Sequence, residues 1–182
     1  TPIHMALEVP THVKKLYILR GDGELIESDV RFLDQLMRHE GAKLAPDGSH
    51  VAYRCPAGAL TIGYGHNLDA NPIEGLGALS VISEARAREI LIADAAVFAA
   101  ALNEEIPWWR RLNAPRQAVL LDMAFNMGVG GLMSFRRTLR AVREQRWKDA
   151  RDGMLASKWA GQVGRRASEL AEQMMTGKWS EE

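Results

Sequence analysis

Three side chains in the first third of the sequence could carry acid, base or nucleophilic chemistry. Glu40 offers a carboxyl group, Cys55 a thiol and Thr61 a hydroxyl. Fourteen residues separate Glu40 from Cys55, and five separate Cys55 from Thr61. A carboxyl group can deliver or accept a proton, and a thiolate can attack carbon or help to orient water. These residue types would permit acid–base or nucleophilic catalysis.

The residues around these side chains predict a helix followed by a small sheet. Ser28 is a candidate N-cap, and the apolar residues of segment 32–37 follow at helical spacing. Glu40 then ends the helix at Gly41. Residues 51–65 contain glycine and proline at positions that no helix would tolerate, so they predict a small antiparallel sheet.

The rest of the chain is predicted to be helical. Ser83 and Asn113 are expected to cap two long helices, the second with Pro115 in its first turn. The second helix is apolar on nearly every face as far as Gly128, which predicts the buried central helix. Ser134 is expected to cap a further helix.

We therefore expect an α+β fold that is predominantly helical. Residues 1–29 are predicted to be an N-terminal extension, in which residues 14–27 have the pattern of a β-hairpin. Residues 30–182 are predicted to form one domain, with a small antiparallel β lobe at about 42–80 and a larger helical lobe at about 83–179. A cleft between two lobes is a natural place for a ligand.

One stretch carries a specific resemblance. Residues 53–66 end in Thr-Ile-Gly-Tyr-Gly-His, and they follow His39-Glu40-Gly41. In this pattern the chain resembles the phage-type lysozymes of glycoside hydrolase family 24, the endolysins of tailed phages. The resemblance covers roughly residues 31–179 and continues in four later motifs: Phe125-Asn126-Met127-Gly128, Trp147-Lys148-Asp149-Ala150, Lys158-Trp159 and Thr176-Gly177-Lys178-Trp179. The spacing from Glu40 to Cys55 is longer than the family usually has, and residues 45–50 look like an inserted turn, which a surface loop tolerates.

The resemblance implies a lysozyme-like two-lobe fold and a muramidase. Such an enzyme hydrolyses the β-1,4 bond between N-acetylmuramic acid and N-acetylglucosamine in peptidoglycan. The reaction needs a proton for the leaving oxygen and a group to capture the oxocarbenium-like carbon. Glu40 would be the general acid, and Thr61 would hold the attacking water. Cys55 takes a place where Asp is commoner; its thiol would orient water or attack the sugar, so the stereochemistry stays open.

Further site residues follow from the resemblance alone. Four positions would line the saccharide cleft: Phe125, Thr138, Asn67 and Gly153. Arg166 would help to hold the carboxylate of Glu40, and His66 is expected to make structural hydrogen bonds in the turn.

Two other functions compete with the muramidase. A lytic transglycosylase needs only one acid/base carboxyl group, and no second carboxylate is evident beside Glu40. Its fragments end in an anhydro sugar and weigh one water less. A non-catalytic peptidoglycan-binding module, or a tail component with an idle site, would release no fragments at all.

Charge and composition limit the kinds of binding partner and cofactor that we expect. The formal net charge is zero, but residues 136–166 hold ten Lys or Arg against three acids. This stretch suits anionic envelope polymers, since no nucleic-acid-binding pattern accompanies it. No cluster has metal-ligand spacing and no cofactor motif is present, so neither a metal nor a cofactor is expected.

The biological setting that we expect is that of a phage lysis enzyme, and a tail component and a bacterial effector stay open beside it. No apolar run is long enough for a transmembrane helix, and the first twenty residues lack a signal peptide. The single cysteine excludes an internal disulfide. We expect a bacteriolytic, antimicrobial monomer that resides in the host cytoplasm and reaches the periplasmic cell wall with the help of a holin.

Overall fold

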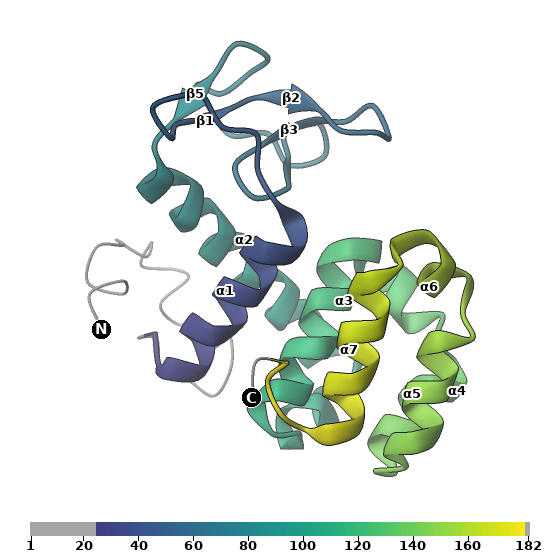
Figure 1. Ribbon diagram of the computed structural model, residues 1–182. Helices are drawn as coiled ribbons and strands as arrows, with labels where there is room; N and C mark the ends of the chain where they lie inside the picture. Colours follow the sequence, from purple (N-terminus) through teal and green to yellow (C-terminus); the bar gives the residue numbers. More distant parts are fainter. Residues whose placement is uncertain (1–24, 181–182) are drawn as a thin grey trace. The chain divides into compact units, whose positions relative to one another are not determined.

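The computed structural model describes residues 25–180 (Figure 1). Of these, residues 25–97 form one compact unit and residues 98–180 belong to a second. The division falls inside one continuous helix, α2 (Glu84–Glu105). The hairpin predicted for residues 14–27 lies almost wholly outside the described residues. The expected lobe boundaries and the cleft between the lobes stay predictions.

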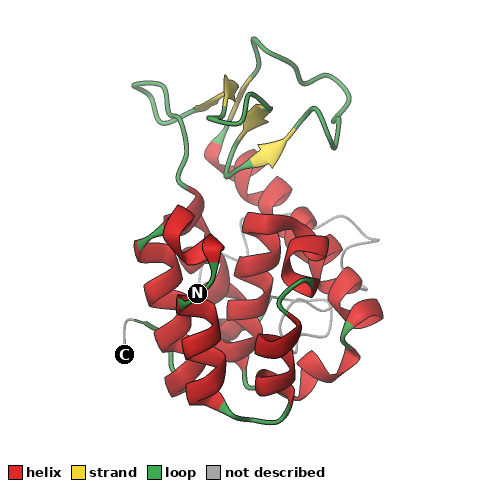
Figure 2. Cartoon of the chain, turned by 90° about the vertical axis from the view of Figure 1, so that its right-hand side faces the viewer, coloured by secondary structure: helices red, strands yellow, loops and turns green. Residues whose placement is uncertain are grey.

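The first unit contains helix α1 (Glu27–Glu40), the start of α2 and two small antiparallel sheets (Figure 2). Its strands are β1 (His50–Val51), β2 (Tyr53–Arg54), β3 (Leu60–Ile62), β4 (His66–Asn67) and β5 (Val81–Ile82). Strand β1 pairs with β5, while β2, β3 and β4 form the second sheet in that order. The predicted small antiparallel β region is therefore confirmed.

The start of α1 differs from the prediction. Its N-cap is Ile26 rather than Ser28, and the helix begins at Glu27. The carboxylate of Asp29 accepts a hydrogen bond from the Ile26 amide at 3.0 Å. Asp29 therefore satisfies a backbone donor that has no partner within the helix, and Ser28 is not needed as a cap.

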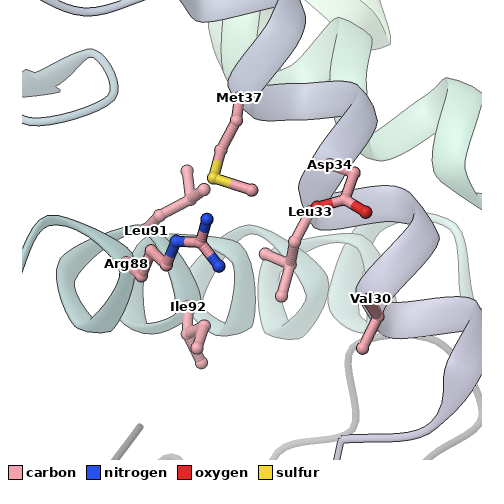
Figure 3. A pocket seen from close by; sticks show the side chains of 7 residues that line it. All are labelled: Val30, Leu33, Asp34, Met37, Arg88, Leu91 and Ile92. Atoms are coloured by element: carbon pink, nitrogen blue, oxygen red, sulfur yellow. The ribbon is translucent and has the colours of Figure 1, made fainter. Parts of the chain in front are cut away.

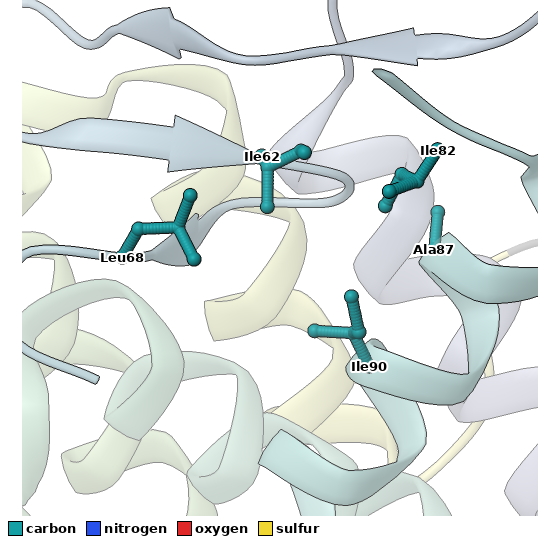
Figure 4. Close-up of a cluster of buried hydrophobic side chains, with 5 residues drawn as sticks. All are labelled: Ile62, Leu68, Ile82, Ala87 and Ile90. Atoms are coloured by element: carbon teal, nitrogen blue, oxygen red, sulfur yellow. The ribbon is translucent and has the colours of Figure 1, made fainter. Parts of the chain in front are cut away.

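Apolar side chains fix the sheets to α2. Figure 4 shows Ile62, Leu68 and Ile82 from the β region gathered over Ala87 and Ile90 of α2. All five are at most 7% exposed. Burying each of the larger side chains, the three isoleucines and Leu68, stabilises the folded state by about 1.5–3 kcal/mol. This cluster therefore holds the sheets in place on the helix.

Helices α1 and α2 also pack on each other within this unit. Figure 3 shows Val30, Leu33 and Met37 of α1 facing Leu91 and Ile92 of α2. The pocket left between them has a volume of only about 10 Å³. A space of that size holds at most one water, so it is no saccharide site.

The second unit is helical. Its elements after α2 are a 3₁₀ turn (Pro107–Arg111), α3 (Ala114–Met133), α4 (Arg136–Arg143), α5 (Trp147–Leu155), α6 (Lys158–Val163) and α7 (Arg165–Thr176). Residues 117–124 of α3 are all buried, as predicted for the central helix. α7 packs against α3 and α5, and α4 packs against α5 (Figure 1).

Of the three caps predicted for the later helices, two are confirmed and one is wrong. The Ser83 hydroxyl accepts from the Arg86 amide at 3.1 Å, and the Asn113 side chain accepts from the Arg116 amide at 3.1 Å. Ser134 caps no helix N-terminus: its hydroxyl donates to the Gly131 carbonyl at 2.6 Å, which closes the end of α3.

The central helix also runs past its predicted end. At Gly128 the backbone leaves helical geometry, with φ +78° and ψ 162°, and then resumes the helix as far as Met133. Gly128 therefore marks a kink where we predicted a terminus, because glycine accepts a positive φ without a steric penalty.

Arg116 ties the beginning of α3 to the end of α7. Its guanidinium donates to the carbonyls of Met174 and Met175 at 2.8 and 3.0 Å. The same group lies 3.6 Å from the ring centroid of Trp147. A Cβ at Gly177 would lie 2.7 Å from the guanidinium carbon, and φ there is +68°, so glycine allows this close approach. We call this set of contacts the Arg116 clamp.

These elements confirm the expected fold class, which is predominantly helical with small antiparallel sheets and consistent with a lysozyme-like fold. Within residues 25–180 no single helix is long and apolar enough to cross a membrane. By length and composition alone, α3 and α4 taken together pass that test, with a bend of 105° between them.

Candidate active site

The carboxyl group of Glu40 lies against the turn that follows β3. Glu40 is the last residue of α1, and the amide of Gly41 closes the helix on the Met37 carbonyl at 3.0 Å. A Cβ placed on Gly65 would lie 2.8 Å from Oε2 of Glu40. Gly65 has φ +82°, a conformation that L side chains rarely adopt. Glycine at this position therefore lets the turn approach the carboxyl group closely.

Cys55 begins the turn between β2 and β3. Its amide donates to the Ala59 carbonyl at 3.0 Å, and its own carbonyl accepts from the Gly58 amide at 2.8 Å. The Ala59 amide is the main cause of a lowered thiol pKa, with smaller contributions from the Ala57 amide and the Thr61 hydroxyl. Donors that point at the sulfur favour the thiolate over the thiol.

Thr61 connects this turn to the middle strand β3. It pairs with Tyr53 on one side and with Asn67 on the other. Its hydroxyl donates to the Ala59 carbonyl at 3.0 Å. A hydroxyl has one proton, so it can serve either this carbonyl or the Cys55 thiolate at a given moment. In the structure the hydroxyl donates to the Ala59 carbonyl. Rotation about its C–O bond would direct the proton to the Cys55 sulfur instead.

Tyr53 is a neighbour that the sequence analysis did not single out. Burial raises its pKa, and the negative charges of Glu40 and Cys55 raise it further. The charges of both predicted catalytic groups therefore favour the protonated phenol of Tyr53. The signal available in the sequence was its position two residues before Cys55.

The longer spacing between Glu40 and Cys55 is taken up by a closed turn. The Ala45 amide donates to the Ser49 carbonyl at 2.8 Å, and the Gly48 amide donates to the Ala45 carbonyl at 2.9 Å. The Asp47 side chain accepts from the Ser49 amide at 3.0 Å. That amide is the main cause of a lowered pKa of Asp47. The residues that looked inserted thus form their own hydrogen-bonded turn before β1.

His66 is held at both ring nitrogens. Nδ1 lies 2.7 Å from Oδ2 of Asp94, and Nε2 lies 2.7 Å from the Asn71 carbonyl. Asn67, predicted to line the cleft, accepts from the Ala70 amide at 2.9 Å through its side chain. Asp94 was not predicted, because it is 28 residues from His66 in the sequence.

The remaining predicted cleft residues belong to the helical unit. Phe125 stacks on Phe98 with ring centroids 4.7 Å apart. Thr138 and Gly153 touch each other, since a Cβ at Gly153 would collide with the Thr138 hydroxyl. Thr138 also lines an open groove of about 620 Å³. The structure therefore brings Thr138 and Gly153 together but leaves Phe125 in an aromatic pair.

Three cationic side chains line that open groove. Arg136, Arg137 and Lys158 line it together with Phe135 and Trp159. In the described part of the chain these three cations make no ion pair. Elsewhere in the basic stretch, Arg146 is paired with Glu144 and Asp149 at 2.9 and 2.7 Å, and Arg151 with Asp152 at 3.2 Å. Three cations without an ion pair in the described part of the chain therefore line the groove.

Arg166 is bound to a buried acid. Its guanidinium lies 2.8 Å from Oδ1 of Asp122, whose side chain is fully buried in α3. The sequence analysis did not identify Asp122 as this partner. The expected role of Arg166 beside Glu40 stays a prediction.

No group of three or more His, Cys, Asp or Glu side chains within residues 25–180 is arranged to hold a metal ion.

Comparison with known proteins assigns the family. Residues 39–173 match the family described as phage lysozyme. The chain is 29% identical over 163 residues to the pre-baseplate central spike protein Gp5 of Enterobacteria phage T4, covering 79% of this chain and 27% of that protein. It is 28% identical over 69 residues to probable T4-type lysozyme 1 of Dictyostelium discoideum, covering 38% of this chain and 41% of that protein. The chain thus spans less than half the length of either relative. It belongs to the phage lysozyme family.

Proposed function

We propose that this chain is a muramidase of the glycoside hydrolase family 24 type. It would hydrolyse the β-1,4 bond between N-acetylmuramic acid and N-acetylglucosamine in peptidoglycan. The observation that carries the proposal is the arrangement of three side chains about strand β3: Cys55 lies in the turn before it, Thr61 within it, and Glu40 against Gly65 in the turn after it. Membership of the phage lysozyme family supports the same substrate class.

In the proposed reaction, Glu40 donates its proton to the glycosidic oxygen as the bond to the anomeric carbon breaks. A water molecule, held by the Thr61 hydroxyl, attacks that carbon. The Cys55 thiolate accepts the proton which this water loses. Proton exchange with solvent then restores the Glu40 acid and the thiolate. The amides that stabilise the Cys55 anion support this role, because a base must be deprotonated when the water attacks.

A direct attack by the thiolate on the anomeric carbon is the competing route. It would give a covalent intermediate and retain the configuration, whereas attack by water inverts it. Proton NMR of the first reducing sugar released distinguishes the α from the β anomer. We expect inversion.

The cations of the open groove support an acidic substrate. Peptidoglycan carries carboxylates on its stem peptides, and Arg136, Arg137 and Lys158 would attract them. This attraction should weaken as salt screens the charges.

The test is mass spectrometry of the fragments released from purified peptidoglycan. The variants are Glu40→Gln, Cys55→Ser and Thr61→Val, with Glu74→Gln as a matched control on an exposed loop. We expect fragments with reducing ends from the wild type and the control, and none from Glu40→Gln. Anhydro fragments would make the chain a lytic transglycosylase, and no release from several peptidoglycan types would make it a binding module.

The biological setting is a separate proposal. A lysis enzyme would leave the cytoplasm through a holin and act on the periplasmic wall. Expression in a bacterial host with and without a membrane-permeabilising protein tests this. Lysis only when both are present is the expected result.

A further inference from the structure

Tyr64, in the turn that contacts Glu40, belongs to a polar cluster with Glu84 and His50. The Tyr64 hydroxyl donates to the carboxylate of Glu84, contacting both oxygens, with Oε2 at 2.8 Å. The same carboxylate lies 3.1 Å from Nε2 of His50. His50 is 1% exposed, and its ring meets that of Tyr64 edge-on with centroids 4.8 Å apart. One carboxylate, on the first residue of α2, therefore holds both β1 and the turn after β3.

The cluster depends on Glu84. Nδ1 of His50 is buried and has no hydrogen-bond partner in the described part of the chain, whereas Nε2 of the same ring is held by Glu84. Burial raises the pKa of Tyr64 to about 12, and the hydrogen bond to Glu84 adds to the effect. Tyr64 therefore remains a donor across the pH range in which the protein would work.

The backbone connects this cluster to the carboxyl group of Glu40. Tyr64 stands between two glycines with positive φ, Gly63 at +62° and Gly65 at +82°. Gly63 packs on α2, where an added Cβ would lie 3.4 Å from the Cβ of Ala87. On the other side, Gly65 packs on the Glu40 carboxyl group. Residues 63–65 thus run from α2 to Glu40, and the Tyr64–Glu84 bond fixes their middle.

We propose that Tyr64 and Glu84 are positioning residues for the general acid. Their hydrogen bond anchors the turn to the start of α2, so that Gly65 holds the Glu40 carboxyl group in the orientation needed to protonate the leaving oxygen. Neither side chain touches the substrate or the reacting atoms in this scheme. The inference rests on the proposed muramidase function.

The test uses two variants that preserve shape. Tyr64→Phe removes the hydroxyl and keeps the ring that meets His50, and Glu84→Gln removes the charge and keeps one acceptor. Glu89→Gln is the matched control, because Glu89 lies on the same helix and makes no side-chain hydrogen bond or ion pair within residues 25–180. We expect kcat for peptidoglycan fragments to fall about tenfold or more in Tyr64→Phe, with KM changed less than about twofold.

Two further readouts separate positioning from a loss of structure. The losses of kcat in the two single variants should not add up in the double variant, because both changes act on the same hydrogen bond. NMR titration of the ¹³C-labelled Glu40 carboxyl group should show a midpoint that moves by about 0.3 pH units or more in Tyr64→Phe and not in Glu89→Gln. Circular dichroism at the assay temperature checks that each variant is folded.

The outcomes are distinct for the two proposals. If the wild type releases no fragments, the muramidase proposal fails and the Glu40 titration alone decides the positioning role. The positioning role is overturned if both variants keep the wild-type kcat and titration. It is equally overturned if the loss of kcat only follows the loss of folded protein.

Discussion

Replacing Gly65 with alanine should displace the Glu40 carboxyl group by a calculable amount. The new Cβ would lie 2.8 Å from Oε2, whereas ordinary contact begins at 3.4 Å, so the two groups must separate by roughly 0.6 Å. A displacement of about 1 Å can cost a catalyst on the order of a hundredfold in rate. We therefore expect Gly65→Ala to lower kcat about 10- to 100-fold.

The backbone adds a cost that is independent of Glu40. A residue with a Cβ at φ +82° loses about 1–2 kcal/mol relative to glycine. At about 2–4 °C per kcal/mol for a chain of this size, the melting temperature should fall by roughly 2–8 °C. The protein should remain folded at 25 °C.

Gly75→Ala separates the two effects. Gly75 has nearly the same backbone angle, φ +83°, but nothing lies within 4 Å of its added Cβ. Both variants should lose similar stability, measured by thermal unfolding, while only Gly65→Ala should lose kcat in the peptidoglycan assay. If the two variants keep equal kcat values while folded, the inferred contact between Gly65 and the catalytic carboxyl group is wrong.

Two further predictions concern titratable groups in the same unit. The lowered pKa of Cys55, caused mainly by the Ala59 amide, should make the native thiol react with an aromatic disulfide reagent at about pH 7 threefold or more faster than the urea-unfolded chain; an equal or slower native rate would contradict it. Desolvation, the largest influence on His66, lowers its pKa, but the hydrogen bond and charge of Asp94 and the Asn71 carbonyl outweigh it and raise the pKa above 6.5. The resulting stability is therefore complete below pH 6.5 and is lost as pH rises through the folded-state pKa. Asp94→Asn should cost about 1–3 kcal/mol in urea unfolding at mildly acidic pH and clearly less in alkaline buffer, and an equal cost in both would exclude the charged pair as the cause.

The sequence predicted the structure best where the controlling contact is local. Ser83 and Asn113 cap their helices through amides three residues away, which a single stretch of sequence displays. Ser28 and Ser134 are also typical capping residues, yet neither caps the N-terminus of a helix. Other contacts determine where α1 begins and where α3 ends. Asp29 reaches back to Ile26, and Ser134 donates to Gly131.

The candidate site followed the same pattern. Glu40, Cys55 and Thr61 were identified because a family motif fixes their order, and in the structure they lie in or beside strand β3 and its two flanking turns. The supporting partners were missed because they are distant in sequence. Glu84 lies 20 residues from Tyr64, and Asp122 lies 44 residues from Arg166. Such pairs depend on how helices pack, which spacing along the chain does not reveal.

The Arg116 clamp has a consequence for how the helical unit is made. During synthesis α3 emerges early, but the carbonyls that receive its guanidinium are 58 and 59 residues further along the chain. Until Met174 and Met175 have been added, the apolar faces of α3 lack their cover from α7, and an incomplete chain with exposed apolar surface is prone to aggregate. A ribosome that pauses before Gly177 has left the exit tunnel would prolong this vulnerable stage, whereas its emergence would leave the nascent unit able to close.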